Sequence, residues 1–449
     1  MRTAIDITGL TGEIVVRGDE SYEVARTMWN RAIDKYPLVI CYCNNEEDVR
    51  NSILWSRKHQ IGIRIRSGRH HYDGYSIGNE VLVIDVSRMN TISINEERQT
   101  VTIDGGVRNR ELYEFLGARG YPFPGGGCPT VGVVGFALGG GWGYSGRLLG
   151  LGCDAIEEIQ LMNGEGEKII ASQAQNPELF WALKGSGGGQ FGVVLRMSFR
   201  LPSKRQEATL IRLEYHETGR EEQIQMFELF QETIQTVCDE VNFKLSFYDS
   251  REKGKGMLLL GIYYGDAQGA HEIIAPFIKL GRSIHIDIKT MSVLEVNRWI
   301  QDAHPDYEYY KSSGRFVNEK LTTRQIETIL DSIEKRANGA IYTAISCYGM
   351  GGQMRQVAHK DASFYYRESL YILGFQTVWV DNQYRKENKN WFLERFKRIE
   401  GITAGSFVNF PAGEIEDYRS AYYGEHRERL ECIKKCYDPN GVFDFEQGL

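Results

Sequence analysis

The sequence has no long apolar run, no cluster of basic residues and no apolar segment at its N-terminus. Without a run of about 18 apolar residues, no helix is expected to cross a membrane. The N-terminus does not resemble a signal peptide, so we expect a cytoplasmic protein whose cysteines remain thiols. The formal net charge is −7 and the basic residues are scattered, which argues against nucleic acid as a partner.

Metal-binding patterns are absent as well. None of the eight cysteines is spaced as a C-x-x-C pair and none of the nine histidines belongs to an H-E-x-x-H motif, so we expect no bound metal. The sequence also contains no internal repeat and no low-complexity tail. A chain of 449 residues with this composition is expected to form two or three globular domains.

Glycine, by contrast, is abundant, and two glycine-rich loops each contain a nucleophilic side chain. His70 lies in residues 66–76, and Cys128 lies in residues 124–132. Glycine has no Cβ, so backbone in such loops can approach a flat or anionic ligand closely. One loop histidine alone is usually a surface residue, and one cysteine alone is usually an inert buried thiol. Because both occur in such loops, we interpret His70 and Cys128 as two covalent anchors for one flavin.

Glycine remains dense over residues 125–152 and again over residues 185–194, and a run such as residues 139–143 cannot form a stable helix interior. The backbone amides of these segments are suited to lie against the phosphates of a ligand. Residues 141–146 match the G-x-G-x-x-G pattern of nicotinamide-binding proteins. That motif requires a single strand-to-helix turn followed by an acidic residue, and the glycine-rich context here fits it poorly. A nicotinamide enzyme therefore remains a distant alternative.

The pattern of apolar residues changes near residue 206. Before it, a helix capped by Asn45 is predicted to end near Gly62, and a strand then leads into the His70 loop. After it, irregularly mixed strands and helices predict an α+β domain with a mainly antiparallel sheet. The expected strands cover residues 208–216, 241–250, 256–266, 285–292, 340–350 and 369–379, and the expected helices cover residues 220–237, 268–280, 322–338 and 382–399.

These motifs resemble those of the berberine-bridge-enzyme-like oxidases, within the wider vanillyl-alcohol-oxidase group of flavoproteins, and the resemblance covers nearly the whole chain. Residues 66–76 resemble the R-S-G-G-H-x-Y-x-G-x-S loop of that family, with Arg69 where glycine is usual. Residues 124–132 resemble its P-G-G-x-C-P-T-V-G segment, and residues 407–410 resemble Y-x-N-Y. The segments 139–143, 179–194 and 422–443 also match the family pattern.

The resemblance implies an α+β fold with a PCMH-type FAD-binding domain of two subdomains and a substrate domain built from an antiparallel sheet and helices. The FAD-binding domain is expected at residues 1–205, with its PCMH-type core at about 34–203. The substrate domain would then cover residues 206–404. Residues 405–449 would return to the FAD-binding domain.

The resemblance also implies that FAD is held by two covalent bonds. His70 would bond to the 8α-methyl carbon of the flavin and Cys128 to ring carbon C6, with Asn409 near the isoalloxazine. For Arg69 and His71, surface salt bridging is the alternative to flavin contact. The remaining residues expected to contact FAD are Arg66, Ser67, Gly68, Gly125, Pro129, Thr130, Val131, Gly135, Gly139, Gly140, Gly143, Tyr144, Gly188, Gly192, Val193 and Val194.

The expected activity is transfer of hydride from an alcohol, a sugar hemiacetal or a secondary metabolite to flavin N5, with reoxidation by O2 giving hydrogen peroxide. Val131 occupies the position that the family uses to gate oxygen, and its small side chain resembles that of the oxygen-reactive members. Two alternatives stay open. One is a dehydrogenase of the same fold that uses another acceptor, and the other is a flavin-carrying binding protein that has lost its catalytic base.

The sequence departs from the family at positions that matter for catalysis. Phe407 and Phe410 stand where tyrosines are frequent, and Gly374 stands where several members carry Gln or Glu. A catalytic base can therefore not be transferred from the family. Tyr144, Tyr365 and Tyr366 are the candidates, with cavity lining or packing as the alternative for each. The substrate and the oligomeric state do not follow from the sequence.

Overall fold

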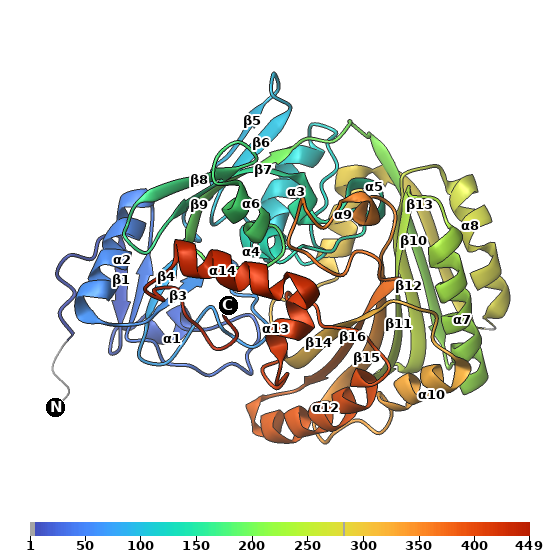
Figure 1. Ribbon diagram of the computed structural model, residues 1–449. Helices are drawn as coiled ribbons and strands as arrows, with labels where there is room; N and C mark the ends of the chain where they lie inside the picture. The colour runs from blue at the N-terminus through green and yellow to red at the C-terminus, as the bar shows by residue number, and fades with distance from the viewer. Residues whose placement is uncertain (1–4, 282) are drawn as a thin grey trace.

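The computed structural model describes residues 5–281 and 283–449, and within them the chain forms three β-sheets. Figure 1 shows the four-stranded and five-stranded sheets at one end of the molecule and the seven-stranded sheet at the other. Helices α13 (Tyr418–Tyr423) and α14 (Arg427–Tyr437) lie in front, between the two ends. The C-terminal segment therefore returns to the end of the molecule where the chain begins.

The four-stranded sheet has the order β1-β2-β4-β3, in which β2, β4 and β3 run parallel. Helix α2 (Glu46–His59) connects β2 to β3, and its N-terminus is capped by Asn45, whose side chain accepts hydrogen bonds from the amides of Glu47 and Asp48. The helix ends at Gln60, which adopts a left-handed φ of 54°, so the predicted helix is confirmed. The strands of this sheet are β1 (Glu13–Val16), β2 (Val39–Tyr42), β3 (Ile63–Arg66) and β4 (Leu82–Asp85), and the short helix α1 (Tyr22–Ala25) precedes β2.

The five-stranded sheet has the order β5-β6-β9-β7-β8, and all its neighbouring strands are antiparallel. The glycine-rich segments lie between its strands and in its connections, where they form short helices separated by loops. The strands are β5 (Ile92–Asn95), β6 (Thr100–Asp104), β7 (Ile156–Met162), β8 (Lys168–Ser172) and β9 (Val193–Arg200). The helices are α3 (Asn109–Gly117), α4 (Val133–Leu138), α5 (Gly146–Leu149), η1 (Gly152–Ala155) and α6 (Pro177–Leu183).

The seven-stranded sheet is fully antiparallel, with the order β13-β10-β12-β11-β15-β16-β14. Helices α7, α8, α10 and α12 cover its outer face (Figure 1). Its strands are β10 (Glu207–His216), β11 (Val241–Ser250), β12 (Gly254–Tyr263), β13 (Ile284–Ser292), β14 (Tyr309–Val317), β15 (Ala340–Gly349) and β16 (Tyr371–Trp379). Its helices are α7 (Arg220–Thr236), α8 (Ala267–Leu280), α9 (Val293–Asp302), α10 (Thr323–Asp331), α11 (Gln353–Gln356), η2 (Asn382–Tyr384) and α12 (Arg385–Glu400), and η3 (Gly424–His426) precedes α14.

Several elements of this part of the chain differ from the sequence-based expectation, among them helix α9, which was not expected. Strand β14 was not expected, because its polar centre at Lys311, Ser312 and Ser313 interrupts the apolar pattern of a strand. The helix expected over residues 322–338 ends at Asp331 instead, and Lys335 just beyond it adopts a left-handed φ of 54° that a helix cannot contain. The predicted α+β architecture with an antiparallel second sheet is confirmed.

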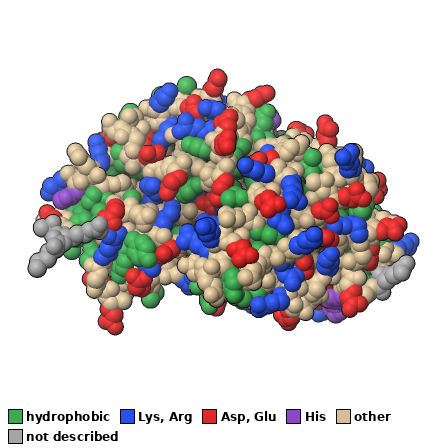
Figure 2. All heavy atoms as spheres, turned by 90° about the horizontal axis from the view of Figure 1, so that it is seen from below, with side chains coloured by type: hydrophobic (Ala, Val, Ile, Leu, Met, Phe, Trp, Pro, Cys, Tyr) green, Lys and Arg blue, Asp and Glu red, His purple; other side chains and the backbone are tan. Residues whose placement is uncertain are grey.

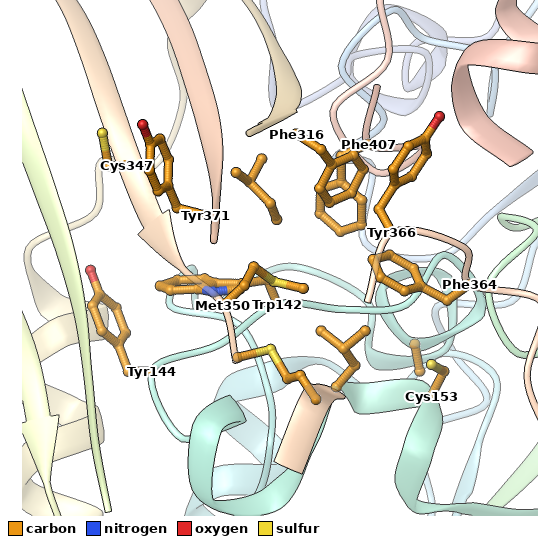
Figure 3. Packing of buried hydrophobic residues seen from close by; sticks show 14 of the residues in the cluster. Trp142, Tyr144, Cys153, Phe316, Cys347, Met350, Phe364, Tyr366, Tyr371 and Phe407 are labelled. Atoms are coloured by element: carbon orange, nitrogen blue, oxygen red, sulfur yellow. The ribbon is translucent and has the colours of Figure 1, made fainter. Parts of the chain in front are cut away.

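A continuous apolar core joins the five-stranded sheet to the seven-stranded sheet. Trp142 lies in it and donates a hydrogen bond from Nε1 to the carbonyl oxygen of Gly349, at 2.7 Å. Figure 3 shows Trp142 beside Met350, with the rings of Phe316, Phe364 and Phe407 nearby. Aromatic side chains that lie far apart in the sequence therefore pack in one apolar interior.

The C-terminal segment is fixed to the N-terminal half by a buried lysine. The Lys434 ammonium donates hydrogen bonds to the carbonyl oxygens of Gln190 and Phe443 and pairs with Asp438 at 2.7 Å. Helix α14 also packs against α6. The domain boundaries near residues 205 and 404 nevertheless stay predictions, because one core spans them.

The surface shows no separation of charge on the face seen in Figure 2, where acidic and basic side chains are interspersed. Across residues 5–281 and 283–449, none of the helices combines the length and the apolar composition that a membrane crossing requires.

A buried ion pair connects the two ends of the molecule and provides a test of their coupling. Arg367 pairs with Asp154 at 2.7 Å, and their side chains are only 1% and 5% exposed. In Arg367→Met the buried Asp154 carboxylate would lose its partner, which we expect to lower the free energy of unfolding by about 3–5 kcal/mol. Urea unfolding followed by tryptophan fluorescence measures this. The control Arg398→Met removes a half-exposed ion pair with Glu394 and should lower the free energy of unfolding by less than about 1 kcal/mol. If the two variants lost the same free energy of unfolding, the stabilising role of the Arg367–Asp154 pair would be contradicted.

Candidate functional site

A cavity of about 490 Å³ lies where the three sheets and the C-terminal segment meet. Its walls come from the loop after β3, the loop after α3, the glycine-rich loop before β9 and the inner face of the seven-stranded sheet. Residues that represent these walls are His70, Cys128, Gly188, Tyr348 and, from the C-terminal segment, Asn409. A cavity of this size with a few polar groups among apolar and aromatic ones is typical of a cofactor or small-molecule site.

The His70 loop and the Cys128 loop lie directly against each other. A Cβ atom at Gly68 would lie 2.3 Å from the amide nitrogen of Gly132 and 2.6 Å from the carbonyl oxygen of Thr130. Only glycine fits there, because real Cβ atoms do not approach backbone so closely. This close approach leaves the Cys128 Sγ atom 4.0 Å from His70 Nε2. The structure therefore brings the two predicted anchors together.

The His70 ring is held in one orientation. Its Nε2 atom shares a hydrogen bond with Thr130 Oγ1 at 2.7 Å, and the ring stacks on Trp29 with a centroid distance of 5.0 Å. Burial, assisted by the nearby charges of Arg108 and His304, lowers the pKa of His70 to about 3. The imidazole is therefore neutral at neutral pH and keeps a free lone pair, as a nucleophile requires.

Cys128 lies in a similar environment. Burial raises the pKa of the Cys128 thiol, although hydrogen bonds from Thr130 and Val131 lower it in part. Its carbonyl oxygen accepts a hydrogen bond from the side chain of Asn109 at 3.0 Å. The Cys128 thiol is therefore neutral in the isolated protein, and the backbone that carries it is held in place.

Several polar atoms around the His70 loop are buried without a hydrogen-bond partner among the described residues. They include Ser67 Oγ, His71 Nδ1 and Ser76 Oγ, all on residues that line the cavity. A buried polar atom without a partner costs about 1–3 kcal/mol, so a polar ligand that fills the cavity would offset this cost. Burial also lowers the pKa of His71 to about 4, so His71 is neutral and is not a salt-bridge residue.

Two arginines flank this loop and play different parts. Arg66 is fully buried and donates from Nε to Asp85 at 2.7 Å. Arg69 adopts a left-handed φ of 65°, the conformation that glycine adopts without strain. Its guanidinium donates a hydrogen bond to the Tyr42 hydroxyl at 2.8 Å and lies 3.9 Å from Asp85. These contacts hold the strained backbone in place.

Another part of the cavity wall contains glycines with free space above them. A Cβ at Gly135, in the middle of α4, would meet no protein atom within 4 Å. At Gly188 a Cβ would come no closer than 3.8 Å to the protein, on the Cα of Gly135. Since both residues line the cavity, the absence of side chains leaves room for a ligand to lie against the backbone.

The structure places thirteen of the predicted site residues at the cavity and the others behind it. Those that line it are Ser67, Gly68, Arg69, His70, His71, Cys128, Val131, Gly135, Tyr144, Gly188, Gly192, Val194 and Asn409. Those that do not line it are Arg66, Gly125, Pro129, Thr130, Gly139, Gly140, Gly143, Val193, Tyr365 and Tyr366. Several of the second group still support the wall: Thr130 binds His70, and Gly143 and Gly139 allow close packing against Gly125 and Asn409.

Of the three candidate catalytic tyrosines, the structure brings only Tyr144 to the cavity. The Tyr366 hydroxyl donates to the carbonyl oxygen of Ala421 at 2.8 Å, and its ring stacks on Phe316. Figure 3 shows Tyr366 within that aromatic group, on the other side of Trp142 from Tyr144. Tyr365 packs against Tyr366 and His426. The positions of Tyr365 and Tyr366 therefore agree with the packing alternative.

Sequence reasoning missed several residues of the cavity wall. Trp29 stacks on His70, while Lys244, Glu308, Tyr348 and Gln376 face the cavity from the seven-stranded sheet and the loop before β14. No local motif marks these residues. They become neighbours of the glycine-rich loops only through the pairing of distant strands.

Comparison with known proteins identifies the class. Residues 37–172 match the family model of an FAD binding domain, and residues 406–449 match the one described as "Berberine and berberine like". An FAD-linked oxidoreductase of Bacillus subtilis, YgaK, is 31% identical over 98% of this chain and 97% of its own length. The reticuline oxidase of Eschscholzia californica is 24% identical over 95% of this chain and 85% of its own length. The carbohydrate oxidase of Microdochium nivale has the same fold, with a TM-score of 0.88, 20% identity and 97% of each chain covered.

This protein is therefore an FAD-dependent oxidoreductase. Within that class, the chain belongs to the berberine-bridge-enzyme-like family, as its motifs predicted. The residues of the cavity fit FAD. Glycines leave the backbone accessible to a large flat ligand, and buried polar atoms without a partner could form hydrogen bonds to the polar groups of that ligand. Two nucleophilic side chains also lie side by side.

The open wall at Gly135 gives a direct test of where FAD binds. In Gly135→Leu a side chain would enter the cavity without a clash with the protein, so we expect a folded protein with little bound FAD. The ratio of flavin to protein absorbance after purification measures this. Gly401→Leu is the matched control, because Gly401 also has a helical φ, of −72°, and free space around it, but lies outside the cavity. Full FAD content in Gly135→Leu would place the cofactor elsewhere.

Proposed function

We propose that this protein is an oxidase that holds FAD through two covalent bonds, one to His70 and one to Cys128, and that oxidises an alcohol or a sugar hemiacetal. The observation that carries the proposal is the distance of 4.0 Å between His70 Nε2 and Cys128 Sγ at the wall of the cavity. Bound FAD would supply an acceptor for the hydride of the substrate and pass the electrons to O2, giving hydrogen peroxide.

The protein's part is to orient the cofactor and the substrate. Thr130 shares a hydrogen bond with Nε2 of His70, and Trp29 stacks on the face of the ring. The other ring nitrogen, Nδ1, is therefore the one that can form a bond to the flavin. Two attachment points from two loops fix a flat ring in its plane as well as in its position. Such fixation lowers the entropy cost of bringing the reacting atoms together.

The substrate side of the cavity is formed by the seven-stranded sheet. Lys244 on β11 and Gln376 on β16 present polar groups, and Tyr348 on β15 and Tyr310 on β14 present aromatic rings. This mixture suits a hydroxylated molecule, since polar groups can bind its hydroxyls while the rings cover its apolar face. The carbohydrate oxidase of the same fold and the reticuline oxidase relative define the two kinds of substrate to test first.

Val131 supports reaction with oxygen. It lines the cavity three residues after Cys128, the position expected from the family to gate oxygen. A small side chain at that position leaves more room than a larger one for O2 beside the cofactor. This favours the oxidase over a dehydrogenase of the same fold.

Covalent attachment can be tested by mass. The denatured chain should be heavier by one FAD, and digestion should leave flavin on both the His70 and the Cys128 peptides. His70→Ala and Cys128→Ala should each retain covalent flavin through the other residue, while the double variant should release all its FAD into the acid supernatant. Cys238→Ala, at an exposed thiol, is the control and should change nothing. Flavin that leaves the wild-type chain on denaturation would refute the two bonds.

The reaction itself is tested by anaerobic flavin reduction with a panel of glucose, cellobiose, benzyl alcohol and reticuline, followed by admission of air. We expect at least one of the four to bleach the flavin absorbance, and air to restore it with formation of one equivalent of peroxide. A flavin that stays bleached for minutes in air would instead identify a dehydrogenase. A flavin that none of the four reduces would favour the binding-protein alternative.

A further inference from the structure

The cavity wall also contains a carboxyl group, that of Glu308. Glu308 precedes β14 and lines the cavity with Lys244 and Cys128. Strand β14 is the edge of the seven-stranded sheet on the side of the four-stranded sheet (Figure 1). Across the described residues, the Glu308 carboxylate makes no hydrogen bond and no ion pair. Glu308 is half-buried, and a carboxyl group that faces a cavity of this kind without a partner is unusual.

The backbone of Glu308 is fixed to the segment that supports His70. The Glu308 carbonyl oxygen accepts a hydrogen bond from the amide of Arg31 at 2.7 Å, and its amide donates to the carbonyl oxygen of Trp29 at 3.3 Å. The Trp29 indole donates to the carbonyl oxygen of Pro305 at 3.2 Å and stacks on His70. The Glu308 loop and the flavin anchor are thus held by the same short segment.

The groups around Glu308 are almost all neutral. From the loop side, burial raises the pKa of Cys128 and of Tyr72, and from the sheet side burial raises the pKa of Tyr310 and of Tyr342. Each of these four groups also feels the charge of Glu308. His304 and His70, at the same end of the cavity, have pKa values lowered by burial.

Among the described residues, Lys244 is the charged group that acts on Glu308, without forming an ion pair with it. Its ammonium group lies 4.9 Å from the centroid of the Tyr348 ring. Burial raises the pKa of Glu308 to about 7, and the Lys244 charge opposes this rise only in part. A carboxyl group in this state can hold or release a proton near neutral pH, which is the property of a general base.

We propose that Glu308 is the general base of this enzyme: it accepts the hydroxyl proton of the substrate while the adjacent carbon is oxidised. The inference rests on the proposed function. The hydroxyl proton goes to the Glu308 carboxylate, and the O–H electron pair becomes the second bond of the carbonyl group. The hydride leaves the carbon with its own electron pair for the bound flavin, so the substrate loses two electrons and two hydrogens.

The other polar residues of the cavity are less suited to this step. Gln376 carries an amide, which is not a base at neutral pH. Burial raises the pKa of Tyr144 far above neutrality, so its phenol stays protonated. At Gly374, where the family resemblance leads one to expect Gln or Glu in several members, a Cβ would lie 2.8 Å from the Tyr348 ring. The Tyr348 ring therefore occupies the space that a side chain at position 374 would need. The carboxylate comes from the loop before β14 instead.

The kinetic test is the pH dependence of flavin reduction, measured by stopped flow with glucose, cellobiose or benzyl alcohol, whichever reduces the flavin. In the wild type the rate should rise with pH through about 7, because the carboxylate form is the active one. Glu308→Gln should lower the plateau rate by about 10²–10⁴-fold and abolish the rise. Asp306→Asn, at an exposed carboxyl in the same loop, is the matched control and should behave as the wild type.

A second readout does not depend on turnover. Infrared difference spectra of the purified holoenzyme against pH should show a carboxyl band that titrates near 7 and disappears in Glu308→Gln but persists in Asp306→Asn. Glu308→Asp should retain the pH-dependent rise at a lower rate, which separates base function from loss of folding. The same rate and pH profile in Glu308→Gln and wild type, or a carboxyl band that persists in Glu308→Gln, would overturn the proposal. If no member of the panel reduces the flavin, the proposed function fails, while the infrared titration still decides the state of Glu308.

Discussion

The contact between two glycine-containing loops is the constraint on which the site depends. His70 and Cys128 are 58 residues apart, and they meet because Gly68 lets one loop rest on the backbone of residues 130–132. A methyl group at Gly68 would separate the loops and with them the two nucleophiles. The same principle applies at Gly143, where a Cβ would lie 2.0 Å from the carbonyl oxygen of Gly125. Glycine therefore shapes this site by close packing as much as by open space.

Burial sets the electrostatics of the cavity. It keeps His70 and His71 neutral, raises the pKa of the surrounding tyrosines and of Cys128, and moves Glu308 into the neutral range. In such a setting a single ionised group exerts a larger effect than at the surface, because the protein interior screens its charge less than bulk water does. The nucleophiles and the carboxylate can thus have separate tasks although they share one cavity.

Much of the site was predictable because its motifs are local. Residue types at short spacing are enough to indicate the His70 and Cys128 loops, the glycine-rich segments and the helix capped by Asn45. The antiparallel second sheet also followed from its strand patterns. These features and the family resemblance predicted the fold class, and they predicted the loops that line the cavity.

What could not be predicted depends on long-range pairing. Glu308 reaches the cavity because β14 joins the edge of the sheet beside β16 and because residues 29–31 hold the loop in front of it. The polar residues in the middle of β14 do not show the apolar alternation of a strand, so β14 was not predicted. The sequence near Trp29 does not indicate that the Trp29 ring stacks on His70. Tyr366 was expected at the cavity but packs away from it. Its ring stacks on Phe316, and this contact between distant residues cannot be predicted from its neighbours in the sequence.

The central claim is that one flavin ring is joined to both loops, and a crystal structure of the yellow holoenzyme tests it most directly. We predict continuous electron density from the His70 ring and from the Cys128 sulfur to the same isoalloxazine. Density that ends at either side chain, with the flavin at van der Waals distance or outside this cavity, would contradict it.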